Sequence, residues 1–528
     1  MRSRGVVVFI ALIVCAQSTL RTDKAFWLDL AHNELQEALQ NKLNLNTAKN
    51  VILFLGDGMG PNTVTATRIH KGGESHRLVF EKFPQMGLLK TYAANYMTPD
   101  SACTASALFC GVKINKDTMA VDATVQRRDC EASLKEGARL ESLAALALKA
   151  GKSTGFVTTM RVTHATPGPL YAQSADRNWE CEAIMPAGTD QCKDIARQLI
   201  EDFPGKDFNV IMGGGRQGLI TNSTETPQDP YDHWGCIRKD GRNLMRAYTD
   251  DKTARGLKHA VVTNNQEFKN VDTANTDYLL GIFANGHMQY DHDRNMGPDG
   301  MPSISEMTET AIKVLSNNKN GYFLMIEGGN IDMAHHRSWV KRAITETAAM
   351  EEAVQVAANM TDEEDTLIIV TSDHTHTMSI NGYQARGSNI FDIATASPRD
   401  GINYTTLTYA TGGPETFQYF VATGEDGVPK VLRRDPSLDD TQDYRYESQA
   451  GILLHENSHG GGDVNIYARG PYAHLFHNVH EQHYVFHAVS YAAKLGEFSS
   501  NSSHSNTHSI HTNFLSLIIV VSIFMKFY

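Results

Sequence analysis

The most constraining feature of this 528-residue chain is the alternation of short apolar runs with longer stretches of helical periodicity. Apolar runs of strand length occupy residues 51–55, 155–159, 208–212, 322–326 and 366–371, and helical patterns occupy 143–150, 305–315 and 340–358. In the last of these, apolar residues recur three and four positions apart, as on one face of a helix. The alternation predicts an α/β fold with a large, mostly parallel central sheet flanked by helices on both faces.

The composition is that of a globular protein and excludes several broad classes. Hydrophobic residues make up 41% of the chain and charged residues 20%, so disorder and coiled coil are excluded as the main architecture. The chain has 60 acidic and 48 basic residues, which gives a net charge of −12. Because nucleic-acid-binding proteins carry a basic surface, we expect no nucleic acid among the partners.

The regular alternation stops between residues 383 and 449, where Gly, Asp, Tyr and Thr are frequent. We expect this segment to be a smaller, irregular subdomain inserted after an α/β core of residues 19–382. The apolar pattern then resumes, so residues 450–501 are expected to return to the core. An amphipathic segment at 26–43 precedes the first strand.

The N-terminus has the features of a secretory signal peptide. Residues 1–18 combine a start containing arginine, an apolar run at 6–16 and the small-x-small sequence Ala16-Gln17-Ser18. A buried N-terminal helix is the alternative. Because Cys15 leaves with the signal, six of the seven cysteines remain in an oxidising compartment. In a secreted chain, three N-x-[ST] sequences become candidate glycosylation sites, at Asn222, Asn359 and Asn403.

The C-terminus has the pattern of a glycosylphosphatidylinositol (GPI) anchor signal. Small residues at 501–503, a polar spacer at 504–513 and an apolar run of 12 residues at 514–525 follow one another. A helix that spans a membrane needs about 20 apolar residues. We therefore expect residues 502–528 to be removed, Asn501 to carry the anchor, and the mature protein to sit on the extracellular face of the cell membrane. A retained tail-anchor helix is the alternative, and Ser499, Ser500 and Ser502 are alternative anchor residues.

Acidic residues and histidines follow three of the predicted strands. They are Asp57 after the first, Glu327, Asp332 and His336 after the fourth, and Asp373 and His374 after the fifth. In open α/β sheets, ligands bind beyond the carboxyl ends of the strands, so these side chains are expected to meet at one edge. Taken singly, each is as readily a turn or surface residue.

A cluster of this kind predicts bound cations. Neighbouring carboxylates repel one another unless positive charge neutralises them. Mixed Asp and His ligands suit Zn²⁺, whereas oxygen ligands suit Mg²⁺. His459, in the sequence HENSHGGGDV at 455–464, is a further candidate ligand.

Ser101 is the candidate nucleophile. It lies in PDSACTASA at 99–107, which is typical of a turn that opens into a helix of small residues. In the first turn, the helix dipole stabilises an ionised serine, and a zinc ion stabilises it further. The alternative is that Ser101 or Asp100 only caps the helix.

These residues belong to a series of motifs that resembles the animal alkaline phosphatases over nearly the whole mature chain. The motifs are GDGMG at 56–60, PDSACTASA at 99–107, THATP at 163–167, DRNW at 176–179, EGGNIDMAHH at 327–336, TSDHTH at 371–376 and HENSHGGGDV at 455–464. The resemblance implies hydrolysis of phosphate monoesters to an alcohol and inorganic phosphate. It also implies one large α/β domain with a crown subdomain, working as a homodimer.

The resemblance implies roles for individual residues. Ser101 forms a phosphoserine intermediate, Arg177 binds the phosphate, and two zinc ions and one magnesium ion are the cofactors. The implied ligands are Asp57, Ser101, Asp373 and His374 for one zinc, Asp332, His336 and His459 for the other, and Asp57, Thr166 and Glu327 for magnesium. His164, His335 and His376 are expected behind these ligands.

Two positions depart from the family pattern. Met333 stands where mammalian members have His and bacterial members have Lys. Mammalian members also carry a calcium-type site, of which Phe283 and Asp299 match. Ala284 replaces one of its glutamates, so we do not expect full calcium binding.

The cysteines can be sorted in part. Cys103 and Cys110 lie seven residues apart on one predicted helix, so their Cα atoms are about 10 Å apart and cannot be bridged. The resemblance pairs Cys130 with Cys192. Cys181 and Cys236 are left by elimination, and their pairing stays open.

Two other classes of function compete with a monoesterase: a related metalloenzyme, either a sulfatase or a phosphodiesterase, and a surface receptor that is not an enzyme. A sulfatase needs its nucleophile in C-x-P-x-R, which the chain lacks. A phosphodiesterase typically has Thr as nucleophile and lacks an arginine for the terminal phosphate. A surface receptor on an inactive scaffold would require lost ligands, whereas every zinc and magnesium position is intact.

Overall fold

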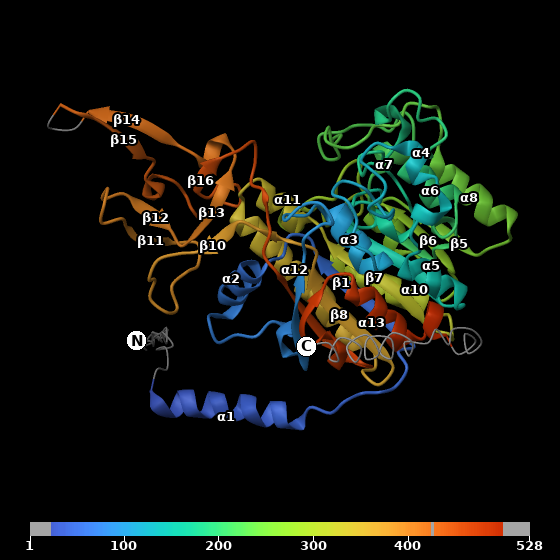
Figure 1. Cartoon of the computed structure of the whole chain (residues 1–528), viewed down its shortest axis with the longest axis horizontal. Coiled ribbons are helices and arrows are strands. Elements are labelled where there is room, and N and C mark those ends of the chain that lie inside the picture. Colours follow the sequence, from blue (N-terminus) through green and yellow to red (C-terminus); the bar gives the residue numbers. More distant parts are fainter. Residues whose placement is uncertain (1–22, 424–426, 500–528) are drawn as a thin grey trace, which may run out of the picture.

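A computed structural model describes residues 23–423 and 427–499 of the chain (Figure 1). Its centre is a ten-stranded sheet with helices on both faces, as the sequence predicts. In spatial order the strands are β19 (Asn478–Glu481), β2 (Gln85–Lys90), β18 (Val464–Arg469), β8 (Thr366–Ser372), β1 (Asn50–Gly56), β7 (Tyr322–Gly328), β3 (Ser153–Arg161), β4 (Val210–Gly214), β6 (Tyr278–Ile282) and β5 (His259–Val262).

The register of the central strands brings three loops to one level. Strand β1 pairs in parallel with β7 on one side and β8 on the other, and Gly56 lies opposite both Gly328 and Ser372. The sheet is parallel except where β18 runs antiparallel to β8 and β2. Since parallel strands end at the same edge, the segments that follow β1, β7 and β8 begin side by side.

Alternate side chains of β1 enter two separate hydrophobic cores. Leu53 and Leu55 belong to one core, and Ile52 and Phe54 to the other, because successive strand residues point to opposite faces. The first core is shared by α3 (Ser101–Cys110), α5 (Leu143–Lys149), α6 (Ile195–Glu201), α7 (Arg216–Leu219), α8 (Leu244–Ala254) and α13 (Tyr484–Ala493). The second is shared by α2 (Pro61–Gly72), α9 (Asn265–Lys269), α10 (Ile304–Leu315), α11 (Asn330–His336) and α12 (Val340–Met360).

The inserted segment forms small separate sheets that project from the main body (Figure 1). Their strands are β10 (Met378–Ile380), β11 (Ile393–Ala396), β12 (Asn403–Thr405), β13 (Leu407–Gly412), β14 (Tyr419–Thr423), β15 (Pro429–Arg433) and β16 (Ala450–Leu453). The sheet β10-β13-β16 extends beyond 383–449 at both ends. A hydrophobic cluster that includes Ile344, Leu407 and Tyr409 packs this part against α12.

The amphipathic segment before the first strand is a helix, α1 (Lys24–Gln40), but it has no buried residue. Asp23 caps it by accepting a hydrogen bond from the Phe26 amide. It lies beneath the main body, away from the sheet (Figure 1). Within residues 23–423 and 427–499, no helix combines the length and the apolar character that crossing a membrane requires. The predicted signal peptide, Asn501 and the apolar tail lie outside the described residues.

Two disulfides link the loops beside the sheet. Cys130 of α4 (Cys130–Ser133) pairs with Cys192, as predicted, and Cys181 pairs with Cys236. Cys103 and Cys110 are free and buried. Among the predicted glycosylation sites, Asn222 and Asn359 are exposed. Asn403 is half-buried, and its amide nitrogen donates to the Asp435 carboxylate at 3.2 Å.

Candidate active site and metal centre

The site lies at the carboxyl edge of β1, β7 and β8, where the sequence predicts it. Asp57 follows β1, Glu327 is near the end of β7, and Asp373 follows β8. All three carboxylates are fully buried. Helix α11 follows β7 directly, and α3 presents its first turn with Ser101.

The Ser101 hydroxyl lies against a group formed by Asp57, Asp373 and His374. Its Oγ is 3.2 Å from His374 Nε2 and 3.5 Å from Asp57 Oδ1. One ligand atom from each of Asp57, Asp373 and His374 lies within 4.8 Å of the others. Asp373 is held by the amides of Gly58 and His374 and by the Thr104 hydroxyl. A cation in this group would contact the serine oxygen.

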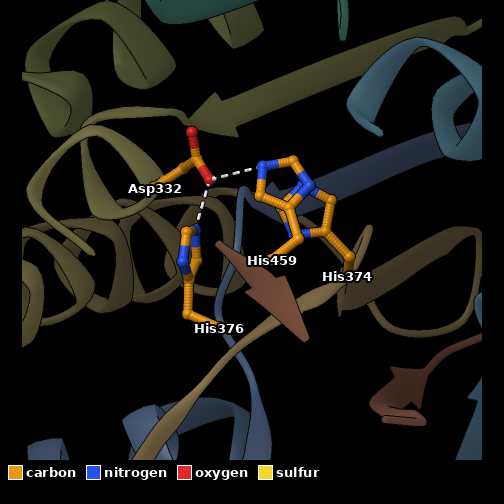
Figure 2. Close-up of side chains that lie close together, drawn as sticks. All are labelled: Asp332, His374, His376 and His459. Carbon is orange, nitrogen blue, oxygen red and sulfur yellow. Dashed lines mark hydrogen bonds and ion pairs between the residues drawn. The ribbon is translucent and has the colours of Figure 1, made fainter. Parts of the chain in front are cut away.

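A second group is formed by Asp332 of α11 with His374, His376 and His459, and one ligand atom from each lies within 4.8 Å of the others (Figure 2). The ring nitrogens nearest to its carboxylate are His376 Nε2 at 2.5 Å, His336 Nε2 at 3.3 Å and His459 Nε2 at 3.6 Å. The Nε2 atoms of His336 and His459 are 3.1 Å apart. His376, which the sequence places behind the ligands, is thus in direct contact with Asp332.

Main-chain carbonyl groups set the direction of the two imidazoles that converge here. Nδ1 of His336 lies 2.8 Å from the Asn457 carbonyl oxygen, and Nδ1 of His459 lies 3.0 Å from the Pro99 carbonyl oxygen. Because a carbonyl only accepts, each Nδ1 carries a proton, and the Nε2 atom of each ring faces the group. This is how metal-binding histidines are usually oriented.

Four buried polar atoms without a hydrogen-bond partner define a third group. They are Asp57 Oδ2, Glu327 Oε1, Thr166 Oγ1 and His164 Nδ1. Ligand atoms of Asp57, Glu327 and His164 lie within 4.8 Å of one another. A buried polar atom without a partner is costly, and several in one place fit the coordination of a cation.

The electrostatics of the site favour added positive charge. Burial, together with the Asp373 and Asp332 carboxylates, raises the pKa of Asp57 well above its usual range. Burial likewise raises the pKa of Glu327 to about 7. Without a cation, the protein environment therefore disfavours the ionised forms of both carboxylates, and a bound cation would stabilise these forms.

The histidines divide into two kinds. Burial lowers the pKa of His459 well below its usual range, which keeps its imidazole neutral and able to bind a metal. Burial opposes charge on His336 as well, but the Asp332 carboxylate raises the pKa of His336 to about 9. Asp332 thus attracts positive charge, either a proton or a metal ion, to this position.

Arg177 contacts Asp100, the residue before Ser101. Its Nη1 donates to Asp100 Oδ2 at 3.0 Å, and its Nη2 is 3.3 Å from His164 Nε2. Asp100 also accepts hydrogen bonds from the amides of Ala102 and Cys103 and so caps α3. The alternative of a helix cap is therefore correct for Asp100, while Ser101 begins the helix beside the metal-type groups.

Sequence reasoning missed several residues that support the site. Asn457 is fully buried, and its Oδ1 contacts His376 Nδ1 at 2.6 Å. The Thr158 hydroxyl donates to Glu327 Oε2 at 2.5 Å. The only sequence feature that could have indicated a role for Asn457 is its position two residues before His459. Thr158 is an ordinary residue of a buried strand.

Comparison with known proteins gives relatives over most of the chain. Residues 48–495 match the alkaline phosphatase family model. The tissue-nonspecific alkaline phosphatase of Felis catus is 44% identical over 485 residues, which cover 90% of this chain and 89% of that protein. The alkaline phosphatase of Gadus morhua is 44% identical, covering 89% and 97%. The membrane-bound alkaline phosphatase of Bombyx mori is 37% identical, covering 91% and 87%.

Solved structures of similar shape are more distant in sequence. The alkaline phosphatase of Thermus thermophilus matches with a TM-score of 0.60 and 22% identity, covering 88% of this chain and 95% of that one. The enzyme from the Antarctic bacterium TAB5 matches with a TM-score of 0.57 and 20% identity, covering 86% and 99%. At these identities the likeness concerns the fold.

Proposed function

The chain belongs to the alkaline phosphatase family of phosphoric monoester hydrolases, and on that premise we propose that it works through a phosphoserine at Ser101. The observation that carries the proposal is the position of the Ser101 hydroxyl against the Asp57, Asp373 and His374 group, one residue from the Asp100 carboxylate that holds Arg177.

We propose two zinc ions and one magnesium ion as cofactors. Asp57, Asp373 and His374 would hold one zinc, and Asp332, His336 and His459 the other, since mixed His and carboxylate donors suit zinc. Asp57, Glu327 and Thr166 offer oxygen donors, which suit magnesium. When bound, these ions supply the positive charge that stabilises the ionised serine and the leaving oxygen.

The residues of the chain then have separate tasks. Ser101 Oγ gives up its proton and attacks phosphorus, and the bond from phosphorus to the leaving oxygen breaks, so that an alcohol is released after protonation by solvent. Water then attacks the phosphoserine, which frees inorganic phosphate and restores the hydroxyl. Arg177 has a planar guanidinium that matches two phosphate oxygens. Asp100 holds this guanidinium in place.

Replacing the nucleophile tests the mechanism. We expect Ser101→Ala to lower kcat by about a thousandfold or more, because a unit of catalysis is lost when its nucleophile is removed. The phosphoenzyme trapped by acid quenching should disappear, while the zinc content stays nearly the same. Ser106→Ala is the matched control on the same helix, since Ser106 binds only the backbone at Ala102 and Ala120. A phosphoenzyme at another residue in Ser101→Ala would contradict the assignment.

We further propose that the mature protein is a homodimer with a crown subdomain at 383–449 and a GPI anchor at Asn501. The tail pattern at 501–525 supports the anchor. A relative from Bombyx mori is named membrane-bound, which is consistent with it. Of the glycosylation sites, Asn222 and Asn359 have the exposure that a glycan requires.

A further inference from the structure

A cavity of about 510 Å³ lies beside α11, outside the metal-type groups. Its lining includes Asn330, Met333 and Arg337 from α11 and the segment after it, with His287, Tyr290 and Trp339 around them. The volume is within the range of small-molecule pockets, about 300–1,000 Å³. The proposed mechanism assigns this cavity no role.

The cavity and the Asp332 group lie against adjacent faces of helix α11. Asp332 and His336 lie one turn apart and face the group, and the next residue after each, Met333 and Arg337, lines the cavity. Neighbouring helix residues differ by about 100° in direction, so the two pairs occupy adjacent faces. Arg337 is fastened to this arrangement, because its Nη1 donates to the Met333 carbonyl at 3.0 Å.

On its other side, the cavity approaches the phosphate-binding arginine through two imidazoles. The rings of His287, which lines the cavity, and His164 are 5.1 Å apart between centroids in an edge-to-face contact. His164 Nε2 in turn lies 3.3 Å from Arg177 Nη2. The lining of the cavity is thus connected with Arg177 through two neighbouring imidazole rings.

The guanidinium of Arg337 lacks a carboxylate partner. It lies 5.1 Å from the Trp234 ring and 5.6 Å from the Trp339 ring, and it makes no ion pair with any described residue. The acidic residues that line the same cavity are already paired, namely Asp229 with Arg216, Asp232 with Arg161 and Asp293 with Arg342. The indoles hold the guanidinium plane by cation–π contact and leave nitrogen donors for a ligand.

We propose that this cavity is a leaving-group subsite, and that Arg337 selects phosphate monoesters whose leaving group carries a second anionic group, a carboxylate or a phosphate. The inference rests on the proposed function, because it takes the reacting phosphate to lie at Ser101 and Arg177. Tyr290 and Trp339 supply flat apolar surface for the body of the leaving group, and the planar guanidinium pairs with either anion through two hydrogen bonds. Met333 adds an apolar wall without charge.

Three aryl esters test the subsite in the metal-loaded enzyme. They are phenyl phosphate, 4-carboxyphenyl phosphate and 1,4-phenylene bisphosphate, and each is measured as kcat/KM. For each of the two esters with a second anionic group, we take the ratio of its kcat/KM to that of phenyl phosphate. We expect Arg337→Gln to lower this ratio by about tenfold, the size expected of one charge-assisted hydrogen bond. A fall for one ester alone identifies carboxylate or phosphate as the preferred group. Ratios that stay the same for both esters overturn the proposal.

The matched control is Arg246→Gln, which removes an exposed arginine on α8 and should leave all ratios unchanged. A second readout is independent of turnover. Calorimetry should give 4-carboxyphenylphosphonate a higher affinity than phenylphosphonate, and Arg337→Gln should remove that advantage. Equal phosphonate affinities in the unmodified enzyme contradict the subsite. Failure of that enzyme to hydrolyse any of the three esters contradicts the proposed function instead, and the phosphonate affinities still decide the subsite.

Discussion

Behind the site, oppositely charged residues are buried as ion pairs, and the pair of Arg161 and Glu180 is the clearest case. Arg161 Nη2 lies 2.7 Å from Glu180 Oε1, and each side chain is less than a tenth exposed. Burial alone would raise the pKa of Glu180, but the Arg161 guanidinium lowers it to about 2. The pair therefore ties the end of β3 to the segment that carries Arg177, and its ionised state matters for folding.

This pair gives a prediction for acid stability. Since the folded-state pKa of Glu180 lies below its ordinary value of 4.5, the folded protein binds fewer protons than the unfolded chain in this range. The stabilisation is complete above about pH 4.5 and is lost as the pH falls towards 2. We expect Glu180→Gln to lower the free energy of unfolding at pH 7 by about 3–5 kcal/mol, because it leaves Arg161 buried without its main partner.

Urea unfolding between pH 3 and 7 checks this expectation. The difference in unfolding free energy between the variant and the unmodified protein should shrink towards acid pH. Glu352→Gln, at an exposed position of α12, is a matched control, and the same change there should have little effect. A difference that is constant over the whole range would contradict the assigned pKa.

At the scale of elements, the site depends on a loop as much as on the strand ends. The segment between β16 and β17 (His459–Gly460) carries Asn457, whose carbonyl orients His336 and whose side chain contacts His376. Its Nδ2 donates to the Thr411 carbonyl at 2.6 Å, which anchors the loop to β13. The loop thus fixes the relative positions of two histidines from different elements.

Loss of this anchor should weaken zinc binding. We expect Asn457→Ala to lower zinc affinity by about 10- to 100-fold, because the loop that carries His459 and positions the main-chain carbonyl beside His336 loses its side-chain anchor. Competition with a chromogenic chelator measures the affinity, and thermal unfolding in excess zinc tells whether the variant still folds. Asn275→Ala, at an exposed asparagine that contacts only Asp272, is the control. Unchanged zinc affinity in a folded Asn457→Ala protein would refute this role.

The strands that the sequence predicts are the ones with continuous apolar runs. Strands β1, β7 and β8 are buried along nearly their whole length, so nothing polar interrupts their pattern. Strands β2 and β5 are only partly buried, and the sequence QMGLLK of β2 fits neither a continuous apolar run nor a strict alternation. These two strands were not predicted, and neither was β6, although its sequence YLLGI is apolar and mostly buried.

The candidate site follows the same division. Asp57 and Asp373 could be predicted because a carboxylate directly after a strand has a known chemical use. The contact of His376 with Asp332 could not be predicted in this form, because it depends on how far the loop after β8 turns back. The lining of the Arg337 cavity also combines segments that are far apart in the sequence.

At the scale of the whole molecule, the proposed GPI anchor gives a prediction about release from the cell surface. We expect phosphatidylinositol-specific phospholipase C to release active enzyme from intact cells, because a 12-residue apolar tail is short for a spanning helix. The released protein should lack every peptide beyond residue 513. A chain truncated after residue 513 should appear in the medium without lipase treatment. A mature C-terminal peptide that contains residues 514–525 would show that the tail is retained.

The main-chain carbonyls that orient His336 and His459 have a consequence for how such a site tolerates change. Neither acceptor belongs to a side chain, so an ordinary point mutation at residue 99 or 457 leaves the acceptor atom itself in place. The path of the backbone therefore sets the orientation of these two imidazoles. If only the histidines and aspartates were transplanted onto another scaffold, the side chains would be present but their orientation would be lost. The loops that contain Pro99 and Asn457 would have to be transplanted together with these side chains.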